Sequence, residues 1–187
     1  MAAPTNPLTT ARLTLRPYRS SDLRAMHELF GRPDVSRYLN WEPMDLEQAQ
    51  ALLERRLTQT SVESDGDGIL LAADETETGR TIGEFMLTLT SRDSRQGEIG
   101  WSIHPDVQGR GLATEGAREM LRLGFEELDL HRIVAECDPR NTASLKVMEH
   151  LGMRREAHFI EHEFLKGEWI GSVVSAILQT EWRESVR

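Results

Sequence analysis

A change of hydrophobic period on either side of a glycine loop, PDVQGRGLATEG at residues 105–116, limits the folds open to this sequence. Before the loop, residues 68–74, 79–91 and 96–104 are three candidate strands in short succession, separated by turn-rich segments, as in an antiparallel meander. After the loop, one apolar stripe recurs at helical spacing through Leu128, which predicts a helix of about four to five turns. The glycine loop is therefore expected to join a strand to the N-terminus of a helix.

Gly109 and Gly111 suit this loop for an anion, because residues without a β-carbon let backbone N–H groups turn inward at the positive end of a helix. A dinucleotide fingerprint needs glycine or alanine where this chain has Thr114, and a strand–helix–strand context that a meander does not provide. A nucleoside triphosphate loop needs Lys and Ser or Thr where Ala117 and Arg118 stand. An ordinary turn without a ligand remains the alternative on this loop alone.

The other segments alternate between strand and helix patterns. The strand patterns lie at residues 11–18, 131–137, 157–167 and 172–182. The helix patterns lie at residues 20–30, 45–57 and 141–152. We therefore expect one α/β domain over residues 1–187, with a central mixed, mostly antiparallel sheet of about seven strands flanked by four helices.

Charge and composition narrow the classes of function. A formal net charge of -9 argues against nucleic-acid binding, because that affinity depends on cations at the phosphates. No apolar run approaches the roughly 20 residues that cross a bilayer, and no basic segment precedes an apolar stretch at the start. We therefore expect no membrane association and a cytoplasmic location. Cys137 is the single cysteine, which excludes an intrachain disulfide and favours a packed thiol.

The glycine loop fits a third phosphate-binding pattern, Q or R-x-x-G-x-G or A, with Gln108, Gly111 and Ala113. With this loop, the opening TARLTLRPYRSSDL and the run NTASLKVMEHLGM, nearly the whole chain resembles the GCN5-related N-acetyltransferase (GNAT) family, and its RimJ/RimL branch in particular. The resemblance implies the GNAT fold, in which the fourth strand (residues 96–104) splays from the fifth (residues 131–137). It also implies acetyl-CoA as co-substrate and no metal.

In the family, the pantetheine arm of acetyl-CoA pairs with the free edge of the splayed strand, and the amides of the loop surround the pyrophosphate. Asn141, at the head of the short helix, matches an asparagine that contacts the cofactor arm and also serves as an N-cap. The resemblance thus assigns cofactor binding to Trp101, Ser102, Ile103, Gln108, Gly109, Arg110, Gly111, Leu112, Ala113, Thr114 and Asn141.

Acetyl transfer to an amine needs a neutral amine, stabilisation of an oxyanion and a proton for the leaving thiolate. The RimJ/RimL branch has an acid serine three residues after the cofactor asparagine, which Ser144 matches, and a base glutamate on the following strand, which Glu163 matches. Glu136 is the rival base, at the position used by RimI-type enzymes, although Met148 replaces the tyrosine acid of that type. Glu98, beside the splayed strand, is a fourth candidate.

Tyr38 and Trp41 lie where the substrate-side loop of the family runs. We expect their rings either to cover the bound acceptor or to pack in the core. The expected reaction is direct attack of a primary amine in a ternary complex, the acceptor being a protein N-terminus or a small amine such as an antibiotic, a polyamine or an amino-acid derivative. A catalytically silent acyl-CoA-binding or regulatory module is the alternative. A homodimer through an edge strand at residues 172–178 is a further hypothesis, although an internal strand is favoured there.

Overall fold

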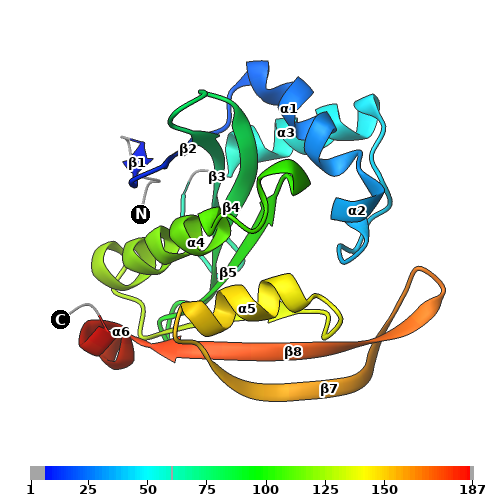
Figure 1. The fold of residues 1–187 in the computed structure, drawn as a ribbon. Coiled ribbons are helices and arrows are strands. Elements are labelled where there is room, and N and C mark those ends of the chain that lie inside the picture. Colours follow the sequence, from blue (N-terminus) through cyan, green and yellow to red (C-terminus); the bar gives the residue numbers. More distant parts are fainter. Residues whose placement is uncertain (1–6, 60, 186–187) are drawn as a thin grey trace.

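A computed structural model describes residues 7–59 and 61–185 of the chain. Within these residues, eight strands form one sheet in the order β1-β2-β3-β4-β5-β6-β8-β7 (Figure 1). Neighbouring strands are antiparallel except β5 and β6, which are parallel. The strands are β1 (Leu8–Thr9), β2 (Leu13–Pro17), β3 (Gly68–Glu75), β4 (Thr81–Ser91), β5 (Gln96–Ile103), β6 (Arg132–Cys137), β7 (Arg154–Leu165) and β8 (Glu168–Leu178).

The same described residues contain six α-helices. They are α1 (Leu23–Phe30), α2 (Pro33–Ser36), α3 (Leu46–Thr58), α4 (Leu112–Arg122), α5 (Thr142–His150) and α6 (Gln179–Ser185). A 3-10 turn, Pro105–Val107, precedes α4, and a π-helical turn, Leu123–Glu127, prolongs it. The predicted helix after the glycine loop is therefore present, with a change of winding in its last turn.

Helices cover both faces of the sheet (Figure 1). Ala72 of β3 packs with the cluster formed by α1 and α3, whereas its neighbours Leu71 and Ala73 pack in the larger cluster that includes α4. Successive residues of a strand face opposite sides, so the two clusters lie on opposite faces of the sheet. The α4 face contains the glycine loop, and the α1 and α3 face is opposite it.

The mixed α/β sheet is confirmed, but the expected counts of about seven strands and four helices are wrong. The additional strand, β1, has two residues, and Leu8 and Thr9 pair with Leu15 and Thr14. Of the two additional helices, α2 is a single turn that begins at Pro33. Elements this short do not establish a hydrophobic period, so the sequence pattern does not reveal them.

The last predicted strand, residues 172–182, is too long: β8 ends at Leu178 and α6 follows. The side chain of Gln179 donates to the carbonyl of Phe125 at 3.0 Å, and the indole of Trp182 donates to the carboxylate of Glu126 at 3.0 Å. Both partners belong to the π-helical turn after α4, so these two contacts draw the chain out of the sheet and into a helix.

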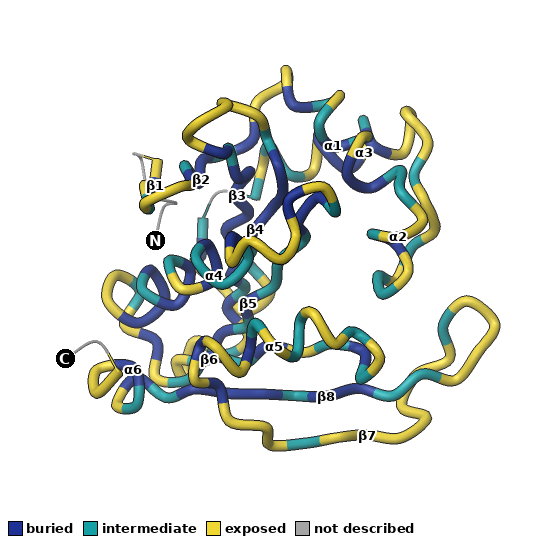
Figure 2. Tube along the Cα trace, in the orientation of Figure 1, coloured by how far each residue is buried: buried dark blue, intermediate teal, exposed yellow. Residues whose placement is uncertain are grey.

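The edge strand of the sheet is β7, because β8 lies between β6 and β7. Residues 172–178 therefore form an internal strand, as favoured, and do not offer an edge to a second copy. Figure 2 shows β8 as largely buried along its length and β7 as almost entirely exposed.

Candidate active site

The two parallel strands β5 and β6 separate partway along their length. They pair only from Gln96 opposite Arg132 to Glu98 opposite Val134. Beyond that point β6 stays paired with β8, and no strand of the described residues pairs with residues 99–103 of β5 on this side. An unpaired strand edge leaves backbone N–H and C=O groups that an extended ligand can pair with. The predicted splay is therefore confirmed.

The glycine loop presents a row of free amides beside this open edge. Within the described part of the chain, the backbone N–H groups of residues 109–114 have no hydrogen-bond partner. Gly109 and Gly111 take φ values of 75° and 78°, in the left-handed region, and α4 starts directly after Gly111. Gln108 joins the loop to the end of β5, since its side-chain amide donates to the carbonyl of Ile103 at 3.2 Å. Free amides at a helix N-terminus form an anion-binding site.

A cleft of about 560 Å³ joins the open strand edge to the glycine loop. Its walls come from α2 and the segment after it, from β5, from the glycine loop and from α5. All residues predicted to bind the cofactor line it, with the exception of Arg110. The unpaired edge and the free amides are therefore two parts of one cavity, and both suit the extended arm and the pyrophosphate of coenzyme A.

Arg110 forms an ion pair outside the cleft. Its Nη2 lies 2.7 Å from Oε1 of Glu75, at the end of β3, whose other carboxylate oxygen accepts a hydrogen bond from Thr78 at 2.9 Å. The carboxylate of Glu75 is 8% exposed. The guanidinium of Arg110 is therefore engaged by a buried partner, and the loop contributes mainly backbone groups to the cleft.

Asn141 and Ser144 meet at the start of α5, where both line the cleft. The side-chain oxygen of Asn141 accepts the backbone N–H of Ser144 at 3.1 Å and so caps the helix. Among the described residues, the amide nitrogen of Asn141 and the hydroxyl of Ser144 have no partner. The cap therefore leaves one donor of each residue available to a ligand, as the two predicted roles of Asn141 require.

Glu98 lies on the opposite face of the sheet from α4. On β4, Glu84 is bound by Arg56 of α3 at 3.0 Å, and it pairs in register with Ser102 of β5. Glu98 and Ser102 are four residues apart on one strand and share a face. The open edge of β5 therefore separates the glycine loop on one face from Glu98 on the other.

Glu136 lies close to Glu98 where the two strands part. It shares a face with Val134, the residue paired with Glu98. The hydroxyl of Ser172 donates to its carboxylate. Burial raises the pKa of Glu98, and the charge of Glu136 raises it further. Within the residues described, neither carboxylate forms a salt bridge, so this end of the opening is acidic.

Of the remaining predicted residues, Tyr38 lines the cleft, whereas Trp41 and Glu163 do not. Tyr38 lines the cleft, and the guanidinium of Arg37 lies over its ring at 5.3 Å from the centroid. Trp41 packs into the α1 and α3 cluster, edge-on to Phe30 with the ring centroids 5.7 Å apart. Glu163 is exposed on β7, in the hairpin that extends beyond α5 (Figure 1), and does not line the cleft.

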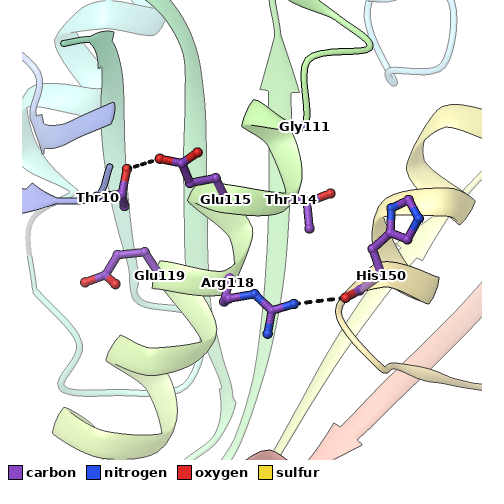
Figure 3. A pocket seen from close by; sticks show the side chains of 7 residues that line it. All are labelled: Thr10, Gly111, Thr114, Glu115, Arg118, Glu119 and His150. Carbon is purple, nitrogen blue, oxygen red and sulfur yellow. Dashed lines mark hydrogen bonds between the residues drawn. The ribbon is translucent and has the colours of Figure 1, made fainter. Parts of the chain in front are cut away.

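A second, more open pocket of about 510 Å³ adjoins the glycine loop between α4 and α5 (Figure 3). Gly111 and Thr114 line both cavities. Arg118 spans this pocket, because its Nη2 donates to the carbonyl of His150 at 3.0 Å. The sequence patterns assign no role to Thr10 and Glu115, which form another wall. The signal for Thr10 is its place at the start of the opening TARLTLRPYRSSDL.

Other features of the described residues give no sign of a different chemistry. In residues 7–59 and 61–185, no group of three or more His, Cys, Asp or Glu side chains is placed to hold a metal ion. None of the helices in these ranges is long and apolar enough to cross a membrane. Burial and the neighbouring Asp138 raise the pKa of Cys137 to about 11, so this thiol stays protonated at neutral pH.

Comparisons with known proteins agree with this site. Residues 12–154 match the acetyltransferase (GNAT) domain. The chain is 31% identical over 180 residues to the uncharacterized N-acetyltransferase YnaD of Bacillus subtilis strain 168. The match covers 94% of this chain and 98% of that protein. It is 26% identical over 174 residues to the spermidine N(1)-acetyltransferase of Escherichia coli strain K12, with 90% and 87% covered.

Among solved structures, the crystal structure of a GNAT family acetyltransferase from Bacillus anthracis superposes with a TM-score of 0.84 at 28% identity. The match covers 94% of this chain and 99% of that chain. A split sheet whose free edge continues into a loop of unpaired amides fits an acyl-coenzyme A-dependent transferase. The chain belongs to the GNAT acetyltransferase family and is an acetyl-CoA-dependent N-acetyltransferase, as the sequence predicted.

Proposed function

We propose that the protein acetylates a primary amine on a small cationic molecule, and that the amine attacks the thioester directly while donor and acceptor are both bound. The observation that carries this proposal is the opening between β5 and β6. On one face it meets the free amides of the glycine loop, and on the other it meets Glu98 and Glu136. Donor and acceptor can then approach from opposite faces of the sheet.

Ser144 is the proposed acid that protonates the leaving thiolate. Its hydroxyl lines the cleft and has no hydrogen-bond partner among the described residues, while its backbone N–H is held by Asn141. A hydroxyl that is positioned by its backbone and free at its side chain can donate to a sulfur that develops negative charge.

Glu98 is the proposed base, with Glu136 beside it. An ammonium group cannot attack a thioester, so a neighbouring carboxylate must take its proton first. Burial raises the pKa of Glu98, which brings this carboxylate closer to the pH at which it exchanges protons with the amine. Glu163, the base that the family resemblance implies, is exposed on β7 and stands as the competing proposal.

The acidic end of the opening supports a cationic acceptor. Glu98 and Glu136 lack a salt bridge within the described residues, and a second ammonium group on the acceptor would supply one. The net charge of -9 also favours the approach of cations. The similarity to a spermidine acetyltransferase, at 26% identity over 90% of this chain, makes polyamines the first compounds to examine.

An acceptor screen tests the proposal by following thiol release from acetyl-CoA. The panel contains diamines and polyamines, aminoglycosides, amino-acid derivatives and peptides with free N-termini, and calorimetry measures acetyl-CoA binding separately. We expect polyamines to be acetylated with the highest kcat/KM. A preference for a peptide would overturn the proposal of a small cationic acceptor. Binding of acetyl-CoA without acetyl transfer to any amine would support the alternative of a catalytically silent acyl-CoA-binding module.

Three variants that remove the same charge identify the base. We expect Glu98→Gln to lower kcat and to remove the acidic limb of the pH profile, because that limb reports deprotonation of the base. Glu136→Gln should mainly raise KM for the acceptor. Glu163→Gln, exposed on β7, is the matched control. Loss of the acidic limb in Glu163→Gln and its retention in Glu98→Gln would return the role of base to Glu163.

A further inference from the structure

The side chain of Arg12 bridges two parts of the glycine loop. Its Nη1 donates to the carbonyl oxygen of Arg110 at 2.8 Å, and its Nε donates to Oε2 of Glu115 at 2.7 Å. The backbone N–H of Arg12 also donates to Oε1 of Glu115 at 2.7 Å, and the hydroxyl of Thr10 reaches the same oxygen at 2.6 Å, as Figure 3 shows for Thr10. The segment before β2 is thus attached to the loop and to the first turn of α4.

The bond to the carbonyl of Arg110 fixes one peptide plane in the loop. In a trans peptide the C=O and the following N–H point in opposite directions. The carbonyl of Arg110 points to Arg12, so the N–H of Gly111 points to the other side of the loop. Gly109 and Gly111 are both left-handed, but glycine adopts positive and negative φ with similar ease, so an outside contact is needed to select one conformation. Arg12 supplies such a contact between the two glycines.

The bond to Glu115 also controls charge at the same place. Glu115 lies in the first turn of α4, next to the free amides, and its side chain is 15% exposed. Burial alone would raise the pKa of Glu115, but hydrogen bonds from Thr10 and Arg12 outweigh it, and the pKa is lowered. The carboxylate is therefore charged at neutral pH, and without Arg12 its charge would repel an anion on the loop.

The loop has no comparable help from its own arginine. Arg110 is paired with Glu75, on the far side of the loop from the cleft lining. The free amides of residues 109–114 bear the partial positive charge that an anion would meet. The orientation of the Gly111 amide and the neutralisation of Glu115 both depend on Arg12, a residue outside the loop.

We propose that Arg12 is a positioning residue for the pyrophosphate of acetyl-CoA: it holds the peptide between Arg110 and Gly111 in the orientation that binds phosphate, and it cancels the charge of Glu115. The opening TARLTLRPYRSSDL thereby gains a role in donor binding. The second arginine of that stretch has a different role, because Arg16 is buried between Asp22 and Asp74 at 2.7 and 2.6 Å.

Two donors, one with and one without the pyrophosphate, test this proposal. Acetyl-CoA contains the pyrophosphate and the 3′-phosphoadenosine attached to it, and S-acetylpantetheine lacks both. In Arg12→Gln we expect Kd for CoA and KM for acetyl-CoA to rise about tenfold, and kcat to stay unchanged. Tenfold corresponds to the free energy of one charged hydrogen bond, here the bond that holds the carbonyl of Arg110. Turnover of S-acetylpantetheine should be unaltered. Arg24→Gln is the control with the same change of charge, since within the described residues Arg24 pairs only with Glu28, at 2.8 Å on the surface of α1.

Two further variants separate orientation from charge. Arg12→Lys keeps the charge but cannot hold the carbonyl and the carboxylate together, so we expect an intermediate loss of CoA affinity. Adding Glu115→Gln to Arg12→Gln should recover part of the affinity, because the repulsive charge is then absent. Should Arg12→Gln fail to fold, Arg12→Lys serves for the comparison of the two donors.

Two outcomes would overturn the proposal. One is a Kd for CoA in Arg12→Gln equal to that of Arg24→Gln. The other is an equal loss of turnover with acetyl-CoA and with S-acetylpantetheine, which would indicate general damage to the fold. CoA binding is measured without an acceptor, so the first outcome does not depend on the proposed amine or base.

Discussion

The ring of Phe85 on β4 lies directly against Gly116 on α4: a β-carbon at Gly116 would come within 2.2 Å of Cζ of Phe85. Phe85 is fully buried. The absence of one side chain therefore sets how closely α4, and with it the glycine loop at its N-terminus, approaches the sheet.

Gly116→Ala should lower the free energy of unfolding by about 1–2 kcal/mol, because overpacking a buried contact outweighs the gain of about 1 kcal/mol in helix propensity. Urea unfolding measures the difference. Phe85→Leu in the same chain should remove part of the penalty, since a shorter side chain leaves room for the methyl group. A Gly116→Ala variant more stable than the wild type would contradict the close approach.

Gly111→Ala should weaken CoA binding, and a second glycine separates strain from function. Gly111 and Gly79 have φ values of 78° and 67°, so alanine costs roughly 1–2 kcal/mol of stability at either position. Gly79 lies in the turn between β3 and β4, where an added β-carbon would meet nothing within 4 Å. Calorimetry should show a raised Kd for CoA in Gly111→Ala only. Equal values of Kd would mean that the loop conformation does not matter for binding.

Ser144→Ala should lower kcat by about a hundredfold or more, the usual contribution of an acid that protonates a leaving group, with Kd for CoA unchanged. Steady-state kinetics and calorimetry check the two statements. Thr142→Ala, also in the first turn of α5 and on the cleft, is the control. If both variants keep the kcat of the wild type, another group or water protonates the thiolate.

Glu156 should make stability depend on pH in acid. Hydrogen bonds from Arg132 and then Arg154 lower the pKa of Glu156 to about 2, below its unfolded value of about 4.3. The stabilisation is therefore complete above about pH 4.3 and is lost as the pH falls towards 2. Because the pair is partly exposed, we expect less than about 1 kcal/mol.

Unfolding of the wild type and of Glu156→Gln at pH 7 and in acid measures this contribution. The difference in free energy should shrink as the pH falls. Glu149→Gln provides the baseline, since Glu149 is exposed on α5 and has no ion pair within the described residues. A difference that stays constant with pH would show that Glu156 acts through packing rather than charge.

The central elements follow from local patterns in the sequence. Alternation predicts β3, β4 and β5, and the apolar stripe after Gly111 predicts α4, because each of these elements is long enough to repeat its period. α6 illustrates the limit: Gln179 and Trp182 form their contacts with the turn after α4, more than fifty residues away in the sequence. Local periodicity cannot report such contacts.

In the candidate site, too, some residues follow from local sequence motifs and others depend on contacts between distant parts of the chain. The loop and α5 carry short motifs, so the residues that line the cleft could be named from the sequence. The sequence predicts that Arg110 faces the phosphate, because it lies within the phosphate motif, whereas Glu75 turns it away. No sequence pattern points to Arg12, which lies 98 residues before Arg110. Glu98 became the preferred candidate for the base only because the register of β5 against β6 places it beside Glu136.

The sheet also consists of two parts that are joined through the short pairing of β5 with β6. Among the described residues, the ladder from Gln96 to Glu98 is the only strand pairing between β1 to β5 and the strands β6, β8 and β7. An extended donor that pairs with residues 99–103 lengthens this seam, as an added strand would. Loading the enzyme should then slow amide hydrogen exchange along the free edge of β5. If the donor pairs with this edge as proposed, it is also a removable part of the sheet.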